Sequence, residues 1–308
     1  MALNNEAWFI HAVTDTVTQL AQQKAAVVDG SCRTKEGVAG KTYPFNRIGS
    51  EDMQQITTRD AATQYANPPQ SKRRVTLSDF GLAVLIDEFD EIKTLTNPKS
   101  EHSQILGYAL ARKRDVICLS PAGLTAAAAA GVANGGFLGK VTTVDEAGET
   151  SSQTDLPTAQ QIVNGGTNLT MAKIRTAKRI MDDADVEDED RFIFYSPIAM
   201  EKLLTDTQVT SSDYNTVKAL VQGGFSNDQT WMGFKWRRST KLPKSGNIRS
   251  LIAVQKMGVG LALGLVKGVE TGKDPNRWNN PFAMVKLSGG AVRVEDARVV
   301  QVDIDETA

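Results

Sequence analysis

Few residues in this 308-residue sequence combine the types and spacing that chemistry needs. Gly40-Lys41-Thr42 matches the end of the phosphate-binding pattern GxxxxGK[ST], in which backbone N–H groups surround the phosphates. The first glycine of that pattern would fall at Lys35. The other Gly-Lys pair, Gly139-Lys140, is followed by Val141 in place of a hydroxyl residue. The sequence therefore excludes a nucleoside triphosphatase loop.

The sequence also lacks complete patterns for dinucleotide, calcium and His-rich metal sites. The sequence GVGLALG at Gly258–Gly264 has one residue too many for a dinucleotide-binding GxGxxG turn and suits close packing of a strand. Acids alternate over 183–189 as in a calcium loop, but Asp188 occupies the glycine position, so a solvated acidic turn is favoured. Two histidines are too few for a His-rich metal site. We expect no catalytic residue, no metal and no cofactor, and a protein that is not an enzyme.

A basic run at Arg112, Lys113 and Arg114, followed by Asp115, is the remaining charged cluster. These side chains have the charge to contact phosphates. Arg112 and Asp115 also have the spacing of an ion pair on one helix face. Such runs mostly form solvated or inter-subunit faces, and the sequence leaves both interpretations open.

The composition favours a soluble folded protein without a dedicated nucleic-acid surface. Its 35 basic and 36 acidic residues give a net charge of −1, whereas nucleic-acid binders carry an excess of Lys and Arg. Two cysteines, Cys32 and Cys118, make no disulfide framework and favour free thiols in a reducing compartment. Neither a membrane span nor a signal-peptide pattern is present, so we expect an intracellular protein without a membrane partner.

The longest helical pattern runs from Asn97 to Gly123 and carries the basic run. Asn97 suits the N-cap and Pro98 the first helical turn, and apolar residues then recur at helical spacing. A second helical stripe, with Phe9 and Val13 on its apolar face, covers residues 1–28. This stripe is either a surface helix on its own core or an arm that docks on another chain.

Residues 32–74 predict a long hairpin with little core of its own. KTYPFNRIG and SKRRVTL are interpreted as its two strands, separated by a polar stretch and Asn67-Pro68-Pro69. Because large apolar residues are few, the hairpin is either loose or held by a partner outside the subunit. Its dense basic residues are Arg47, Arg59, Lys72, Arg73 and Arg74.

The remaining sequence interleaves helices and strands without a βαβ rhythm, which favours an α+β fold. Helices are expected over 155–163, after Asn168 and around Tyr214–Val221. A buried strand over 191–196 is followed by a helix that begins at Pro197. WMGFKWRRS and SLIAV are interpreted as two strands, and Gly289-Gly290 as a turn between the closing strands.

The order of these parts resembles the major capsid protein of tailed bacteriophages, which has the Hong Kong 97-like fold. RFIFYSPIAMEKLLTD is similar to the family's central-domain strand with its Ser-Pro helix start. SSDYNTVKALVQGG followed by WMGFKWRRSTKLP is similar to its run of helix, glycines and strands. ALARKRD resembles part of the spine helix, and SGGAVRVEDARVVQVDIDE the final strands. The resemblance covers nearly the whole chain and includes no catalytic signature.

The resemblance implies four parts, one of them discontinuous. They are an N-terminal arm (1–35), an extended β-hairpin loop (36–80), a peripheral domain with a spine helix at 98–119 (81–134 and 263–308) and an axial domain (135–262). The extended loop would lie over a neighbouring subunit, and the spine helix would pack its apolar face under the closing strands.

The resemblance also implies a function. The chain would self-assemble through hexamers and pentamers into an icosahedral shell that encloses double-stranded DNA without sequence-specific binding. It would reside in the virion capsid after assembly in the host cytoplasm, with scaffolding, portal and decoration proteins as further partners. Arginines of the loop suit bidentate pairing with carboxylates of the next chain. The candidate inter-subunit contacts are Arg47, Arg59, Lys72, Arg73, Arg74, Asp87, Glu88, Asp90, Glu91, Arg112, Arg114, Phe9 and Val13.

Two alternatives stay open at this point. The same fold serves encapsulin-type bacterial nanocompartment shells, which enclose enzyme cargo. A small-ligand-binding α+β protein is an alternative of a different class. Covalent cross-linking through Lys and Asn side chains, which some members of the fold use, is not favoured because no local pattern marks such residues.

Overall fold

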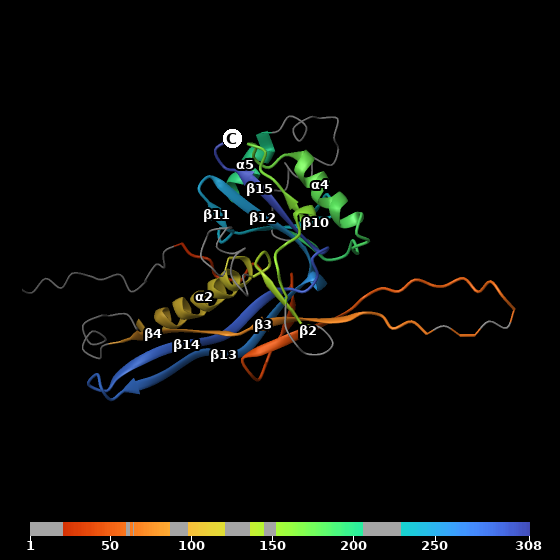
Figure 1. Cartoon of the computed structure of the whole chain (residues 1–308). Helices are drawn as coiled ribbons and strands as arrows, with labels where there is room; N and C mark the ends of the chain where they lie inside the picture. The colour runs from red at the N-terminus through yellow and green to blue at the C-terminus, as the bar shows by residue number, and fades with distance from the viewer. Residues whose placement is uncertain are drawn as a thin grey trace, which may run out of the picture. The chain divides into compact units, whose positions relative to one another are not determined.

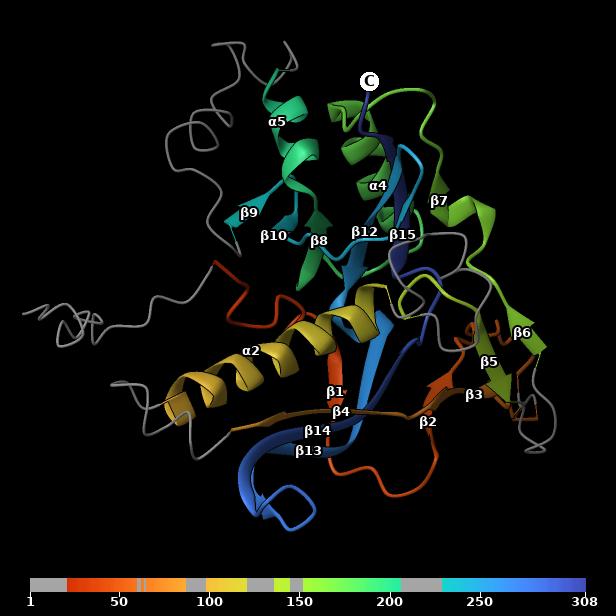
Figure 2. The same ribbon diagram turned by 90° about the vertical axis from the view of Figure 1, so that its left-hand side faces the viewer.

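The fold was examined in a computed structural model, shown from two sides in Figures 1 and 2. The described residues are 21–59, 62–63, 65–86, 98–120, 136–144, 152–205 and 229–308. The chain divides into two compact units. Unit 1 comprises Met1–Ala25, Phe80–Arg112 and Val266–Leu287, and unit 2 comprises Ala26–Asp79, Lys113–Leu265 and Ser288–Ala308.

Unit 1 contains most of helix α2 (Pro98–Leu119), together with the end of one long strand and the start of the next. These strands are β13 (Val259–Asp274) and β14 (Asn280–Arg293), in a sheet with the order β1-β13-β14-β4. The edge strands are β1 (Arg33–Lys35) and β4 (Ser78–Leu85). The core of unit 1 joins one face of α2 to β14 and β4 through Leu106, Ala283, Val285, Val84 and Leu110. The predicted helix over 98–119 is confirmed, and so is its packing on a closing strand.

Unit 2 contains a seven-stranded sheet with the order β7-β15-β12-β8-β10-β9, and β11 pairs with β12. All five residues of β8 are buried, which fits a central strand and confirms the strand predicted at this position. β8 pairs in parallel with β10 and antiparallel with β12. The bounds are β7 (Gln161–Ile162), β8 (Arg191–Tyr195), β9 (Gln229–Trp231), β10 (Phe234–Arg238), β11 (Lys244–Ser245), β12 (Ile248–Gln255) and β15 (Val299–Asp305).

Helices α4 (Met171–Asp182) and α5 (Pro197–Thr205) lie beside this sheet (Figure 2). Both agree with the predicted helices. The Lys173 side chain of α4 donates hydrogen bonds to the carbonyls of Asn164, Thr167 and Asp303 at 2.8, 2.8 and 3.0 Å. This ammonium group therefore joins α4 to strand β15 and to the loop that precedes the helix.

A second sheet of unit 2 has the order β2-β3-β5-β6, with β2 (Thr42–Ile48), β3 (Gln70–Thr76), β5 (Val141–Val144) and β6 (Ser152–Thr154). β2 and β3 pair antiparallel, which confirms the predicted hairpin. Phe45 and Val75 are nearly fully buried in a cluster with Val141 of β5. The expectation that the hairpin buries almost no core is therefore wrong at its base, where β13 and β14 supply the partners that the local sequence lacks.

Three predicted elements differ in the structure. Residues 155–163 form a 3-10 turn (Thr158–Gln160) and strand β7, because Gln161 and Ile162 pair with β15. WMGFKWRRS is a hairpin, since Met232 and Gly233 both have positive φ and connect β9 to β10. Gly289-Gly290 is no turn: β14 continues through it, and a Cβ on Gly290 would lie 2.8 Å from the Val75 side chain. These two glycines permit close approach of neighbouring strands.

The predicted domain division also needs one correction. It groups residues 263–308 with 81–134, but β15 pairs along its length with β12, in the same sheet as β8. The final strand therefore belongs with the region predicted as the axial domain. The mixture of largely antiparallel sheets and a few helices agrees with the α+β class. The predicted helix around Tyr214–Val221 lies outside the described residues.

Candidate inter-subunit contact site

The stretch between β2 and β3 is almost entirely exposed. Every described residue from 49 to 69 is exposed except the half-buried Pro68, and Figure 1 shows these segments running out from the two strands. Large apolar side chains take part: Met53, Ile56 and Tyr65 are 95%, 81% and 93% exposed. Surfaces of this kind are typical of contact sites, because exposed apolar area is stabilised when a partner covers it.

The base of the hairpin is held by a buried ion-pair network. Arg73 of β3 is 3% exposed and donates to both carboxylate oxygens of Asp296, at 2.8 and 3.4 Å. Arg293, which is fully buried, donates to the same carboxylate at 2.5 Å and to the carbonyl of Gly139 at 3.0 Å. Burial raises the pKa of Asp296, but the hydrogen bonds from both arginines outweigh it and hold the pKa below its ordinary value.

This geometry corrects the expectation that Arg73 is an exposed contact residue. Its guanidinium is buried against Asp296 of its own chain and joins β3 to the segment after β14. The other basic residues of the hairpin are more accessible: Lys72 and Arg59 are exposed and Arg74 is half-buried. These three side chains are accessible enough to contact another subunit.

Arg47 lies beside a groove of about 730 Å³ at the base of the hairpin. Its guanidinium donates to Ser71 Oγ at 2.9 Å and reaches the Val294 carbonyl at 3.4 Å, and burial lowers its pKa. Further lining residues include Arg33, Ile48, Met257, Glu295 and Arg298. Three arginines against one glutamate make the groove basic, and exposed Ile48 and Met257 add apolar surface.

Arg33, Met257 and Arg298 were not predicted as part of a site. They come from β1, the turn before β13 and the segment before β15, which are far apart in the sequence. Nothing in the local sequence marks them, because only the paired strands bring them together. Arg298 is also engaged within the chain, since it donates to Glu295 at 2.5 Å and forms an ion pair with Glu187.

The two predicted contact arginines of α2 bind residues within the predicted N-terminal arm, 1–35. Within unit 1, Arg112 donates to the Gln22 side chain at 2.7 Å. Within unit 2, Arg114 pairs with Asp29 at 3.0 Å. The structure does not bring them together with Arg47. The remaining predicted contacts, Asp87, Glu88, Asp90, Glu91, Phe9 and Val13, lie outside the described residues.

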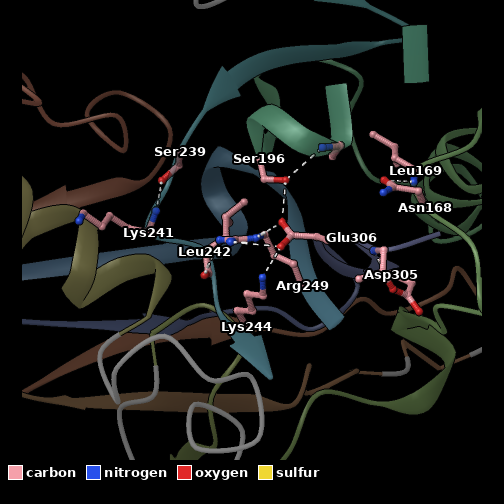
Figure 3. Close-up of polar contacts among 12 residues, drawn as sticks. Asn168, Leu169, Ser196, Ser239, Lys241, Leu242, Lys244, Arg249, Asp305 and Glu306 are labelled. Atoms are coloured by element: carbon pink, nitrogen blue, oxygen red, sulfur yellow. Dashed lines mark hydrogen bonds and ion pairs between the residues drawn. The ribbon is translucent and has the colours of Figure 1, made fainter. Parts of the chain in front are cut away.

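A separate polar cluster surrounds Glu306, close to the C-terminus of the chain in unit 2 (Figure 3). The Glu306 carboxylate accepts from Arg249 Nε at 2.5 Å and from Lys244 Nζ at 2.6 Å. Ser196 Oγ also donates to it at 3.3 Å and accepts from the N–H of Ala199 in the first turn of α5. The Glu306 side chain is only 4% exposed, so this cluster is a structural tie between the chain end, β12 and α5.

Within the described ranges, no three or more His, Cys, Asp and Glu side chains are grouped as a metal site would require. In the same part of the chain, no helix is long and apolar enough to cross a membrane.

Residues 6–306 match the family model for phage capsid proteins. The chain belongs to the phage capsid protein family. The expectation of a bacteriophage capsid protein, drawn from the order of its parts, is thus confirmed. A comparison with curated proteins gave no match.

Several solved capsid structures contain chains similar to this protein. The capsid of cyanophage P-SCSP1u aligns with a TM-score of 0.69 and 18% identity, over 96% of this chain and 93% of that one. The capsid of Ralstonia phage GP4 aligns with a TM-score of 0.68 and 13% identity, over 96% and 95% of the two chains. The capsid of a native GTA particle aligns with a TM-score of 0.68 and 9% identity, over 99% and 98%. At these identities the similarity establishes the fold.

Proposed function

We propose that this capsid protein is the major shell subunit of a tailed phage. It assembles through hexamers and pentamers into an icosahedral shell that encloses double-stranded DNA. The observation that carries the proposal is the exposed hairpin segment 49–69, with Met53, Ile56 and Tyr65 in water. Burying one such side chain against a second copy contributes on the order of 2 kcal/mol, so repeated contacts around a capsomer favour assembly.

Several elements of the chain fit the parts of a Hong Kong 97-like subunit. The seven-stranded sheet with α4 and α5 corresponds to an axial domain, and α2 with β13 and β14 corresponds to a spine helix and its peripheral strands. Residues 1–35 are an N-terminal arm and the hairpin is the extended loop. In this arrangement the loop lies over a neighbouring copy, which offsets the entropy of ordering a segment without its own core.

The basic groove at the base of the hairpin is the second contact surface of this proposal. Arg47 and Arg33 face it, and the arginine guanidinium suits bidentate pairing with carboxylates. Lys72, Arg74 and Arg59 extend the basic surface along the hairpin. The acidic run at Asp87, Glu88, Asp90 and Glu91 of the next copy is the proposed partner.

The subunit's role is structural, without catalysis. Its net charge of −1 suits a shell that contacts DNA without reading its sequence. Scaffolding, portal and decoration proteins are its further partners, and assembly takes place in the host cytoplasm before the protein resides in the virion. The family match favours a phage shell over an encapsulin-type nanocompartment and over a small-ligand-binding protein.

Electron microscopy of the purified recombinant protein tests the proposal. We expect capsomers or closed shells of the wild-type protein, and their loss in the triple variant Met53→Ser, Ile56→Ser, Tyr65→Ser. A matched control replaces the exposed Val163 with Ser, outside the hairpin. Assembly should survive that change. A wild-type protein that stays monomeric under all assembly conditions contradicts the proposal, as does a triple variant that assembles normally.

A further inference from the structure

The segment that precedes β1 is fastened to the C-terminal part of α2, within unit 2. The Asp115 carboxylate accepts hydrogen bonds from the N–H groups of Val27 and Val28, at 3.0 and 3.1 Å. Arg114 pairs with Asp29 at 3.0 Å. Two successive side chains of α2 therefore fix three successive residues of the chain at one place.

This fastening brings the only two cysteines of the sequence together. Cys118 follows Asp115 by three residues, so both lie on one face of α2. On the other side, the turn at Gly30 (φ 81°) folds the chain back, and Cys32 Sγ lies 3.9 Å from the Val28 carbonyl oxygen. Asp115, one turn before Cys118, and the Cys32 thiol therefore contact the same residue, Val28, which brings the two cysteines close together although they are far apart in sequence.

The environment gives the two thiols different chemistry. Cys32 is 3% exposed and Cys118 is fully buried. The neighbouring Cys118 thiol is the main cause that lowers the pKa of Cys32, whereas burial raises the pKa of Cys118. Because the thiolate is the nucleophile in disulfide chemistry, Cys32 is the residue that reacts first with an oxidant.

We propose that Cys32 and Cys118 form an intramolecular disulfide under oxidising conditions, which covalently ties the segment before β1 to the last turn of α2. With an azo oxidant such as diamide, the Cys32 thiolate adds to one nitrogen of the N=N bond. Cys118, after losing its proton, attacks the Cys32 sulfur, so that the S–S bond forms and the S–N bond breaks. Two electrons and two protons end on the oxidant, which leaves as the hydrazine.

The disulfide would hold the segment before β1 on the last turn of α2 and stabilise unit 2. It closes a long loop of chain between β1 and α2 and so restricts the unfolded state. A reducing cytoplasm keeps the pair as thiols during synthesis, and exposure to an oxidising medium closes it. The proposal does not depend on the shell function, because both cysteines belong to one chain and to one unit.

Alkylation and mass spectrometry test the inference on the full-length protein. Folded wild-type protein is treated with diamide, unfolded, and alkylated with iodoacetamide. We expect both cysteines to escape alkylation, a peptide linking Cys32 to Cys118, and recovery of two alkylated thiols after dithiothreitol. Cys32→Ser and Cys118→Ser are the matched controls, and each should keep its single thiol without dimer formation.

Stability gives a second readout that needs no variant. The oxidised wild-type protein should unfold at a higher urea concentration than the reduced protein, and dithiothreitol should reverse the difference. Two fully alkylated cysteines after oxidation of the folded protein overturn the inference, and so do cross-links that form only between chains. Either result can occur while shells still assemble, so it is distinguishable from failure of the proposed function.

Discussion

Arg73 of β3 forms a bidentate ion pair with Asp296, which follows strand β14 and lies 223 residues further along the sequence. The pair is buried on the Arg73 side and is shared with Arg293. One carboxylate thus holds two guanidinium groups from two strands. It fixes the base of the exposed hairpin to the segment after β14, within unit 2.

Replacing Arg73 with Ala should destabilise the subunit itself. The change leaves the buried side of Asp296 with one cation instead of two, and removing a partner of a buried pair costs about 3 kcal/mol. Urea unfolding of the unassembled protein measures the loss. The neighbouring Lys72→Ala is the matched control, because Lys72 is exposed on the same strand. It should change the unfolding free energy by less than about 0.5 kcal/mol.

This expectation reverses the one that the sequence supports. From sequence, Arg73 and Arg74 are equivalent candidates for contacts with a neighbouring subunit, and neither is expected to stabilise its own subunit. The structure separates them, because Arg73 is buried and Arg74 is half-buried. Equal stability of Arg73→Ala and Lys72→Ala would show that the Asp296 pair contributes nothing to the fold.

Some elements of this fold follow from local sequence patterns, and others form only through pairing with distant strands. Helix α2 and strands β2, β3 and β8 were predicted because their apolar spacing or turn residues are local signals. Strand β7 was missed, because its two residues are strand only through pairing with β15. The two glycines in β14 predict a turn from sequence, but their role is close packing against a strand that the local sequence does not reveal.

Only part of the candidate site can be predicted from the sequence. Arg47 was identified because it lies in a hairpin dense in basic residues. Arg33 and Arg298 were not, since each is an isolated charge in its own segment and joins the groove through strand pairing. The burial of Arg73 was equally hidden, because its partner Asp296 is distant in sequence.

Glu306 should make the stability of unit 2 sensitive to acid. Burial raises the pKa of this carboxyl, but hydrogen bonds from Arg249 and Lys244 outweigh it and lower the pKa below 4.5. The folded state therefore binds the proton more weakly than the unfolded state. The stabilisation is fully present above the unfolded pKa and is lost as the pH falls through the folded pKa.

The measurement is the unfolding free energy of wild type and Glu306→Gln between about pH 7 and pH 3. We expect the variant to be less stable at neutral pH and to lose less stability on acidification. The exposed Glu201→Gln on α5 is the control and should follow the wild-type curve. Parallel curves for wild type and Glu306→Gln would contradict the assigned role.

The contribution of Lys173 to stability should change on the alkaline side of neutral pH, whereas that of Glu306 changes on the acidic side. Burial lowers its pKa from 10.5 to about 8, and its three carbonyl acceptors hold the side chain between α4 and β15. Between these two pH values the unfolded state binds more protons than the folded state, so this residue's contribution to stability rises with pH. Lys173→Met removes that rise, which urea unfolding at pH 7, 8.5 and 10 would detect. A variant with an unchanged pH profile would refute the shifted pKa.

Gly260→Ala should disrupt the packing between β13 and the hairpin base. Gly260 pairs with Arg33 of β1, and a Cβ at this position would lie 2.6 Å from the ring of Phe45. Phe45 is 2% exposed and cannot move without opening the core around Val75 and Val141. We expect a loss of about 2 kcal/mol, the usual cost of overpacking a well-filled core.

Gly268→Ala on the same strand is the matched control, because nothing lies within 4 Å of its added Cβ. It should leave stability unchanged or raise it slightly, since alanine restricts the unfolded chain more than glycine does. The double variant Gly260→Ala, Phe45→Leu should recover part of the loss, because the smaller side chain makes room for the methyl group. If Gly260→Ala is as stable as Gly268→Ala, the ring of Phe45 does not pack on β13 as closely as described, and the contribution of this contact to stability is refuted.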